Sequence, residues 1–204
     1  LRVASWLDST AIVICDLVDD SSGDPIEVAP RSILRRQIAQ VEAAGYTPFA
    51  ASELEFYLFN DTYEVAREKR YHDIARAGWY IEDYHIFQGT KEDDVVGGIR
   101  NHLQSSGVPV EFSKGEWGPG QQEINIRYAE ALEMADRHTL YKHIAKEVAW
   151  GHDKSLTFMA KWDADEAGSS CHIHMSLRDI AAAASAFVGA GAEPVPDSKV
   201  VCTP

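Results

Sequence analysis

The chain has 204 residues, of which 45% are hydrophobic, so it is long enough for one ordinary domain with a real core. Its 32 acidic residues outnumber the 19 lysines and arginines and give a net charge of −13. This charge has the wrong sign for general binding of nucleic acid or of an anionic membrane, so neither partner is expected. No segment approaches the roughly 18 consecutive apolar residues of a membrane span. The three cysteines, Cys15, Cys171 and Cys202, have no metal-like spacing and suit a reducing cytoplasm.

The first half of the chain predicts strands and a helix in alternation. Residues 10–19 have the composition of a buried strand, and a helix is expected from Pro30, at its first position, to Gly45, at its C-terminal cap. Residues 51–59, rich in aromatic and branched side chains, predict a further strand. Residues 63–84 have many aromatic side chains and no clear period, so they are expected to form a long ordered loop.

The second half predicts two helices and two pairs of strands. The expected elements are a helix over 91–107, a strand–turn–strand unit over 108–128 around Gly-Pro-Gly, the longest helix over 129–152, and two strands over 155–162 and 170–177. The tail over 179–204 is rich in alanine, glycine and proline, and nothing in it completes a fold.

The strand over 51–59 places two carboxylates side by side. Successive side chains of a strand point to opposite faces, so Glu53, Glu55 and Tyr57 share one face, and the apolar residues between them form a core face. Two glutamates on one strand face repel each other unless a cation lies between them. An acidic chain that handles an anionic substrate would also need such a cation.

Two other predicted strands show the same division between a polar and an apolar face. The polar faces carry Glu123, Asn125 and Arg127 on one strand and His172, His174 and Ser176 on the other, and Glu116 lies just before the Gly-Pro-Gly turn. If the three strands belong to one sheet, that sheet has a dry side and a side populated by metal-ligating residue types. Each pair alone is usually a solvated face or a structural histidine pair, but their joint occurrence favours a metal site.

Carboxylate oxygens with one imidazole suit magnesium or manganese better than zinc. Four carboxylates exceed what one magnesium ion usually takes from a protein, so two metal ions are the expected number. A two-metal hydrolase is compatible with this polar face alone, although no dedicated hydrolytic base stands out.

The ordered set "ASELEFYLF", "GEWGPGQQEINIRYAEAL", "LTFMAKW" and "GSSCHIHMSL" resembles type I glutamine synthetases and their relatives. The resemblance implies an α+β fold, with a curved antiparallel sheet and helices. Residues 1–29 would be the end of a β-grasp domain, and residues 30–204 the N-terminal portion of the catalytic domain. The chain is therefore expected to be a truncated part of such an enzyme. It would lack the family's arginine-rich segment and last metal-ligating glutamate, and so be inactive alone.

The resemblance also implies roles for individual residues. The matching positions are Glu55, Glu116 and Glu123 for one metal, Glu53 and His172 for the other, His174 and Ser176 for the nucleotide, and Gly168 and Tyr84 for the substrates, Tyr84 at the ammonium pocket. Glu55 and Glu123 are the residues on which catalysis is expected to depend.

The implied reaction ligates glutamate to ammonia or another amine. The γ-carboxylate of glutamate attacks the γ-phosphate of ATP, and an amine then displaces phosphate from the acyl phosphate. Two Mg²⁺ or Mn²⁺ ions would neutralise the transferring group. The full-length parent would be cytoplasmic and would form hexameric rings stacked into dodecamers.

Departures from the usual glutamine synthetase wording favour a γ-glutamyl-amine ligase. Ala167 replaces a side chain that touches the glutamate in that family, and Ser170 replaces a loop glycine. These differences resemble the branch that ligates glutamate to polyamines, ethanolamine or other amines. The remaining alternative is a non-catalytic remnant that binds metal or nucleotide.

Overall fold

The fold is built around one long strand, β3 (Tyr46–Phe59), in a computed structural model that describes residues 1–187. One edge of β3 pairs with β5 (Gln121–Glu130), and β4 (Val110–Gly115) pairs with β5 on its outer side. The other edge of β3 pairs with β7 (Cys171–Asp179) and, further along, with β6 (Ser155–Thr157). Every pairing in this sheet is antiparallel. The central strand β3 pairs directly with β5 and β7, the two other strands that carry predicted site residues.

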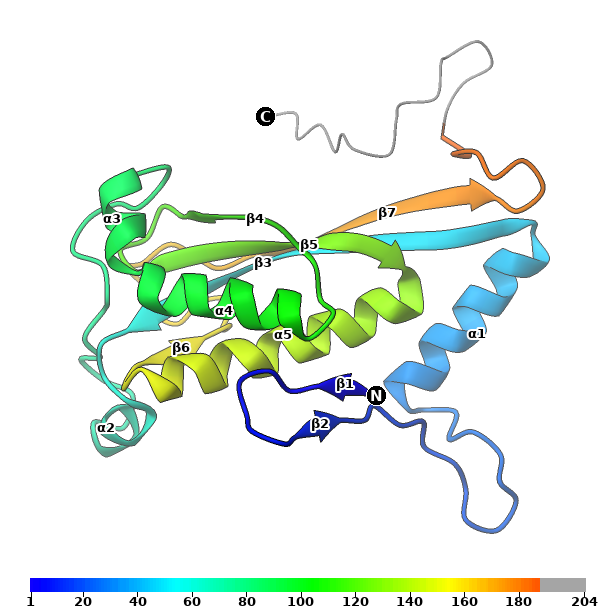
Figure 1. Cartoon of the computed structure of the whole chain (residues 1–204), viewed down its shortest axis with the longest axis horizontal. Helices are drawn as coiled ribbons and strands as arrows, with labels where there is room; N and C mark the ends of the chain where they lie inside the picture. Colours follow the sequence, from blue (N-terminus) through cyan, green and yellow to red (C-terminus); the bar gives the residue numbers. More distant parts are fainter. Residues whose placement is uncertain (188–204) are drawn as a thin grey trace.

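Two long helices cover the apolar face of the sheet. Helix α4 (Asp93–Ser105) and helix α5 (Ala131–Gly151) pack against each other below the strands, and α1 (Pro30–Ala43) lies at one end (Figure 1). Two short helices, α2 (Tyr63–Glu68) and α3 (Ile86–Lys91), lie in the connection between β3 and α4. The chain thus has the expected α+β fold, with helices on an antiparallel sheet.

The alternation expected of β3 is confirmed by its burial. Leu54, Phe56 and Leu58 are buried in the core against the helices, together with Ile124 and Ile126 of β5. Full burial of each such side chain contributes about 1.5–3 kcal/mol. This apolar face holds the register of β3 against β5, because a slip by one residue would turn these side chains to the polar face.

A bulge in β5 interrupts the polar face beyond Asn125. Ser52 is paired with Ile126 and Ala50 with Ala129, so two residues of β5 lie opposite the single Ala51 of β3. Arg127 is one of these two residues, and it is exposed. Regular alternation of side chains does not continue through a bulge, so the strand pattern beyond Asn125 no longer follows the period of two.

The N-terminal strand is much shorter than predicted. Only β2 (Ala11–Ile12) forms within residues 10–19, as a two-stranded hairpin with β1 (Arg2–Val3). Val13, Leu17 and Val18 are exposed, because beyond Ile12 this run has a single bridge, between Val18 and Pro25, in place of a sheet partner.

Three other expectations need correction. The presumed loop over 63–84 contains α2, which begins at the cap formed by Thr62, whose hydroxyl accepts the backbone N–H of Val65 at 3.2 Å. The strand expected over 155–162 ends at Thr157. The apolar back of β7 is largely exposed, because α5 packs against β3, β5 and β6, whereas β7 pairs with the far end of β3.

No helix in residues 1–187 has the length and apolar character needed to cross a membrane. The predicted tail lies within the described residues only up to residue 187.

Candidate metal centre

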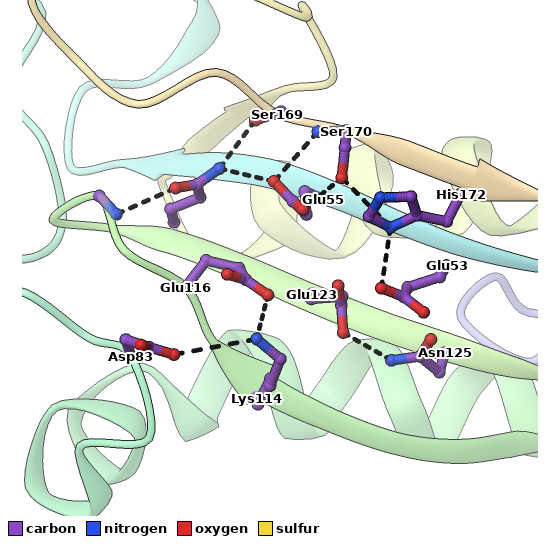
Figure 2. A network of polar contacts seen from close by, with 12 residues as sticks. Glu53, Glu55, Asp83, Lys114, Glu116, Glu123, Asn125, Ser169, Ser170 and His172 are labelled. Carbon is purple, nitrogen blue, oxygen red and sulfur yellow. Dashed lines mark hydrogen bonds and ion pairs between the residues drawn. The ribbon is translucent and has the colours of Figure 1, made fainter. Parts of the chain in front are cut away.

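The strand register brings the predicted carboxylates together. Glu55 of β3 lies directly opposite Glu123 of β5, and Glu53 lies opposite Asn125 on one side and His172 of β7 on the other. These pairs follow from antiparallel pairing, in which opposite side chains share a face. Figure 2 shows the carboxylates of β3 and β5 on the same side of the sheet, with His172 next to Glu53.

Glu116 joins this group from the hairpin between β4 and β5. One carboxylate oxygen from each of Glu55, Glu116 and Glu123 lies within 4.8 Å of the others. Glu55 is 8% exposed and Glu123 only 2%, and Glu116 is half-buried. Three carboxylates this close and this far from water are unfavourable unless protons or cations compensate their charge.

Glu55 is held in place from two directions. The side-chain amide of Gln121 donates to Glu55 Oε2 at 2.8 Å. The backbone N–H of Ser170 donates to the same oxygen at 3.0 Å, and the Ser170 hydroxyl donates to Oε1. Gln121 belongs to β5 and Ser170 to the loop before β7, so both neighbours of β3 fix the orientation of this carboxylate. Figure 2 shows Ser170 beside Glu55.

Glu53 contacts both histidines of β7. His172 Nδ1 lies 2.9 Å from Glu53 Oε1, and His174 Nε2 lies 3.1 Å from Oε2. The imidazoles are more than half exposed, whereas the Glu53 side chain is mostly covered. This carboxylate therefore orients two imidazoles next to the three-carboxylate cluster.

The carboxyl groups of Glu53 on β3 and Glu123 on β5 differ in acidity. Burial is the main cause that raises the pKa of Glu123 to about 8; the hydrogen bond from Asn125 opposes it, and Glu53 and Glu116 add to it. Burial also disfavours the charged form of Glu53, but hydrogen bonds with His174, Glu123 and His172 outweigh it and lower its pKa. Glu123 thus holds a proton at neutral pH, hydrogen-bonded to the ionised Glu53.

A lysine neutralises the third carboxylate of the cluster. The Lys114 ammonium donates to Glu116, and it lies 4.0 Å from Asp83. It also lies 4.8 Å from the centre of the Tyr84 ring. Tyr84, predicted at the amine pocket, is 74% exposed, and its ring contacts Lys114, which is paired with Glu116.

The other predicted substrate and nucleotide residues lie at different distances from the cluster. The Gly168 carbonyl accepts a hydrogen bond from the Gln121 amide at 3.0 Å, so this backbone position lies next to Glu55. Tyr57 donates its hydroxyl hydrogen to the Ala167 carbonyl at 2.9 Å and fixes the same loop. Ser176 lies further along β7, opposite Phe49, away from the carboxylates.

Four carboxylates and one imidazole match the preferences of a hard divalent cation. Oxygen ligands suit Mg²⁺ and Mn²⁺, and His172 is compatible with Mn²⁺ as well. The proton on Glu123 and the ammonium of Lys114 compensate charges that a cation would otherwise balance. The chemistry of these residues therefore fits divalent metal ions.

Two residues that support the site were not predicted from the sequence. Gln121 shares the strand parity of Glu123, so the alternation rule would have placed it on the polar face. Ser170 lies in a loop without periodicity, and only the three-dimensional contact with Glu55 reveals its part.

Residues 27–201 match the glutamine synthetase catalytic-domain family. The chain belongs to this family. It is 44% identical over 179 residues to a gamma-glutamylethanolamide synthetase of Streptomyces coelicolor, a match that covers 88% of this chain and 38% of the relative. It is 38% identical over 181 residues to a glutamate–isopropylamine ligase of a Pseudomonas species, covering 89% of this chain and 39% of the relative.

The solved structure of apo GmaS without ligand has the same fold, with a TM-score of 0.73 and 30% sequence identity. The match covers 83% of this chain and 39% of GmaS. This chain thus spans about two fifths of the length of its glutamine synthetase-family relatives. The resemblance and the fold predicted from the sequence are confirmed, and the family favours a ligase over a two-metal hydrolase.

Proposed function

We propose that this chain forms the metal-binding part of the active site of an ATP-dependent ligase that joins glutamate to an amine. The observation that carries the proposal is the cluster of Glu55, Glu116 and Glu123, whose oxygens lie within 4.8 Å of one another. The proposal gains support from the names of two relatives, a gamma-glutamylethanolamide synthetase and a glutamate–isopropylamine ligase.

Two Mg²⁺ or Mn²⁺ ions are the proposed cofactors. Glu55, Glu116 and Glu123 would hold one ion, and Glu53 and His172 would contribute to the other. Bound divalent cations supply neutralisation of the charge on the phosphate groups of ATP. Glu123 must release its proton to become a ligand, and Gln121 and Ser170 hold Glu55 in one orientation before any ion binds.

The remaining proposed roles concern the substrates. His174 and Ser176 would contact the nucleotide, and the backbone at Gly168 would contact the amino-acid end of glutamate. Gly168 suits such a role because its carbonyl is already tied to Gln121 beside Glu55. Tyr84 would face the incoming amine. Its exposed ring lies beside Lys114, which is paired with Glu116.

The proposed reaction has two steps. The γ-carboxylate of glutamate attacks the γ-phosphate of ATP, so that ADP leaves and an acyl phosphate forms. The amine nitrogen then attacks the acyl carbon, phosphate leaves, and the nitrogen loses one proton. Activation is needed because a carboxylate does not react with an amine at neutral pH. An amine other than ammonia is favoured by Ala167 and by both named relatives.

Domain organisation and assembly are part of the same proposal. Residues 1–29 would be the end of a β-grasp domain, and residues 30–204 part of the catalytic domain. The whole protein would work in the cytoplasm as rings of six subunits stacked into dodecamers.

A chimera tests the catalytic part of the proposal. Residues 27–187 would replace the segment that they match in the Streptomyces coelicolor relative, and phosphate release would be measured with ATP, glutamate and Mg²⁺. Ammonium, ethanolamine, isopropylamine, putrescine and spermine would be compared side by side. We expect release with an alkylamine to exceed release with ammonium, and we expect none from the 204-residue chain alone.

The outcomes separate the alternatives. A preference for ammonium would indicate an ordinary glutamine synthetase. A folded chimera that binds Mn²⁺ and ATP without releasing phosphate would indicate a non-catalytic binding module. The chimera with Glu123→Ala is the control for background release.

A further inference from the structure

A buried carboxylate outside the metal cluster holds the hairpin that carries two of its members. Glu82 lies in the segment between α2 and α3 and is fully buried. Its Oε1 accepts the backbone N–H of Gly120 at 2.7 Å, and its Oε2 accepts a hydrogen bond from the side-chain amide of Gln122. Both donors belong to the Gly-Pro-Gly turn and the start of β5, which are far from Glu82 in sequence.

The segment around Glu82 has no room to slide against this turn. A Cβ atom added at Gly78 would lie 2.0 Å from Glu82 Oε1 and 2.1 Å from the Gly120 nitrogen. A Cβ atom added at Gly115 would lie 2.5 Å from the Glu82 carbonyl oxygen. Glycines on both sides therefore allow a backbone approach that fixes the position of the Glu82 carboxylate.

The turn that Glu82 holds lies between two proposed metal ligands. Glu116 precedes the turn and Glu123 follows it, and the backbone N–H of Glu116 donates to the Gln121 carbonyl at 2.8 Å to close the hairpin. Gln121, in the same turn, donates to Glu55. A displacement of this turn would move all three carboxylates of the cluster relative to one another.

The residues next to Glu82 reach the same cluster by another route. Asp83 lies 4.0 Å from Lys114, and Tyr84 lies 4.8 Å from it, and Lys114 donates to Glu116. Tyr84 has a backbone φ of 54°, a conformation that a tyrosine rarely adopts unless its surroundings impose it. The hydrogen bonds of Glu82 thus also fix the positions of its neighbours Asp83 and Tyr84.

We propose that Glu82 is a positioning residue that, by binding Gly120 and Gln122, holds Glu116 and Glu123 in the geometry needed to bind a divalent metal ion. The inference rests on the metal-binding part of the proposed function. Glu82 itself does not contact the reacting atoms; it acts through the turn. Outer partners of this kind commonly change metal affinity by about 10–100-fold when they are removed.

The test measures Mn²⁺ affinity of the full 204-residue chain by the loss of the free-ion electron paramagnetic resonance signal. Thermal stability is recorded for every variant without metal. Glu82→Ala removes both acceptors. Glu82→Gln places an amide donor against the amide donor of Gln122, and the double variant Glu82→Gln with Gln122→Glu restores a donor–acceptor pair with the same net charge.

Glu92 offers a matched control. It is also a buried glutamate, 2% exposed, and its Oε2 has no hydrogen-bond partner among the described residues. Glu92→Gln is expected to leave Mn²⁺ affinity unchanged, because Glu92 lies directly before α4 and, among the described residues, its side chain forms no hydrogen bond or ion pair with the hairpin.

We expect Glu82→Ala and Glu82→Gln each to weaken Mn²⁺ binding by about tenfold or more. The double variant should recover most of the affinity that Glu82→Gln loses. If Glu82→Gln binds Mn²⁺ as tightly as the wild type but has a lower melting temperature, the role of Glu82 is purely structural. That result would overturn this inference and leave the proposed metal site intact. If Glu82→Ala does not fold, the Mn²⁺ affinities of Glu82→Gln and of the double variant still test the inference. Absence of saturable Mn²⁺ binding in the wild type would overturn the proposed metal site and this inference together.

Discussion

Glu55 and Glu123 lie directly opposite each other on β3 and β5, with Gln121 beside them donating to Glu55. In a sheet without metal, two opposed carboxylates destabilise the strand pair unless one keeps its proton. Glu123 does so, because burial raises its pKa to about 8. The apolar core beneath β3 and β5 keeps Glu55 and Glu123 opposite each other. The stability of the core thus offsets the unfavourable approach of the two carboxyl groups.

Removal of a cluster carboxylate should weaken metal binding. Glu55→Gln and Glu123→Gln keep the size of the side chains but replace a carboxyl group that can ionise and bind the cation with a neutral amide, and we expect Mn²⁺ affinity to fall by about tenfold or more in isothermal titration calorimetry. Glu130→Gln, on the exposed end of β5, is the control and should bind like the wild type. Equal affinity in all three variants would contradict the proposed ligands.

Stability without metal should fall as the pH rises. Burial raises the pKa of Glu82 to about 7 and that of Glu123 to about 8, from an ordinary value of 4.5. At a pH between the ordinary pKa of 4.5 and these raised pKa values, the unfolded chain has already released protons that the folded chain retains. The free energy of unfolding therefore decreases as the pH rises. Each unit of pKa difference corresponds to about 1.4 kcal/mol, so a loss of several degrees in Tm is expected between about pH 5 and pH 8.

Calorimetric scans in a chelator across that pH range measure this slope. Glu123→Gln, which cannot ionise, should show a flatter slope than the wild type. A melting temperature that rises steadily from pH 5 to pH 8 would contradict the sign of the shift.

Gly120 should not tolerate a side chain. Its φ of 84° lies in the left-handed region, and an added Cβ would meet the Leu58 carbonyl oxygen at 2.8 Å. Gly120→Ala is therefore expected to lower the free energy of unfolding by about 2 kcal/mol or more, which is roughly 4–8 °C in Tm. Gly151→Ala is the control, since nothing lies within 4 Å of its added Cβ; equal melting temperatures for the two variants would oppose this account.

The exposed back of β7 should promote association of the chain. Ile173 is 56% exposed and Met175 is 66% exposed on the same face of this strand. Contiguous apolar surface of this kind commonly mediates association. Sedimentation velocity should show a sedimentation coefficient that rises with concentration, and Ile173→Ser with Met175→Ser should reduce that rise. Ile33→Ser, on α1, is the control, and the prediction fails if the wild type is a monomer at every concentration.

The parts of the fold that depend on local periodicity were predictable. The alternation in β3 correctly separated its buried apolar residues from Glu53 and Glu55, and Pro30 and Gly45 correctly marked the ends of α1 and its cap. Periodicity could not show the bulge at Arg127, because a bulge depends on how β5 meets its partner. It also could not show that the back of β7 lies outside the area covered by α5.

The site itself was only partly predictable for the same reason. Glu53, Glu55, Glu116, Glu123 and His172 could be grouped from strand parity and from the family resemblance. Glu82 could not, since it lies in a segment without a period and approaches Gly120 only through tertiary packing around Gly78.

Anomalous diffraction at the manganese edge, from crystals of this chain grown with Mn²⁺, tests the metal centre most directly. We expect one anomalous peak within bonding distance of Glu55, Glu116 and Glu123 and a second at Glu53 and His172. Crystals that contain Mn²⁺ but show no peak at these five side chains would contradict it.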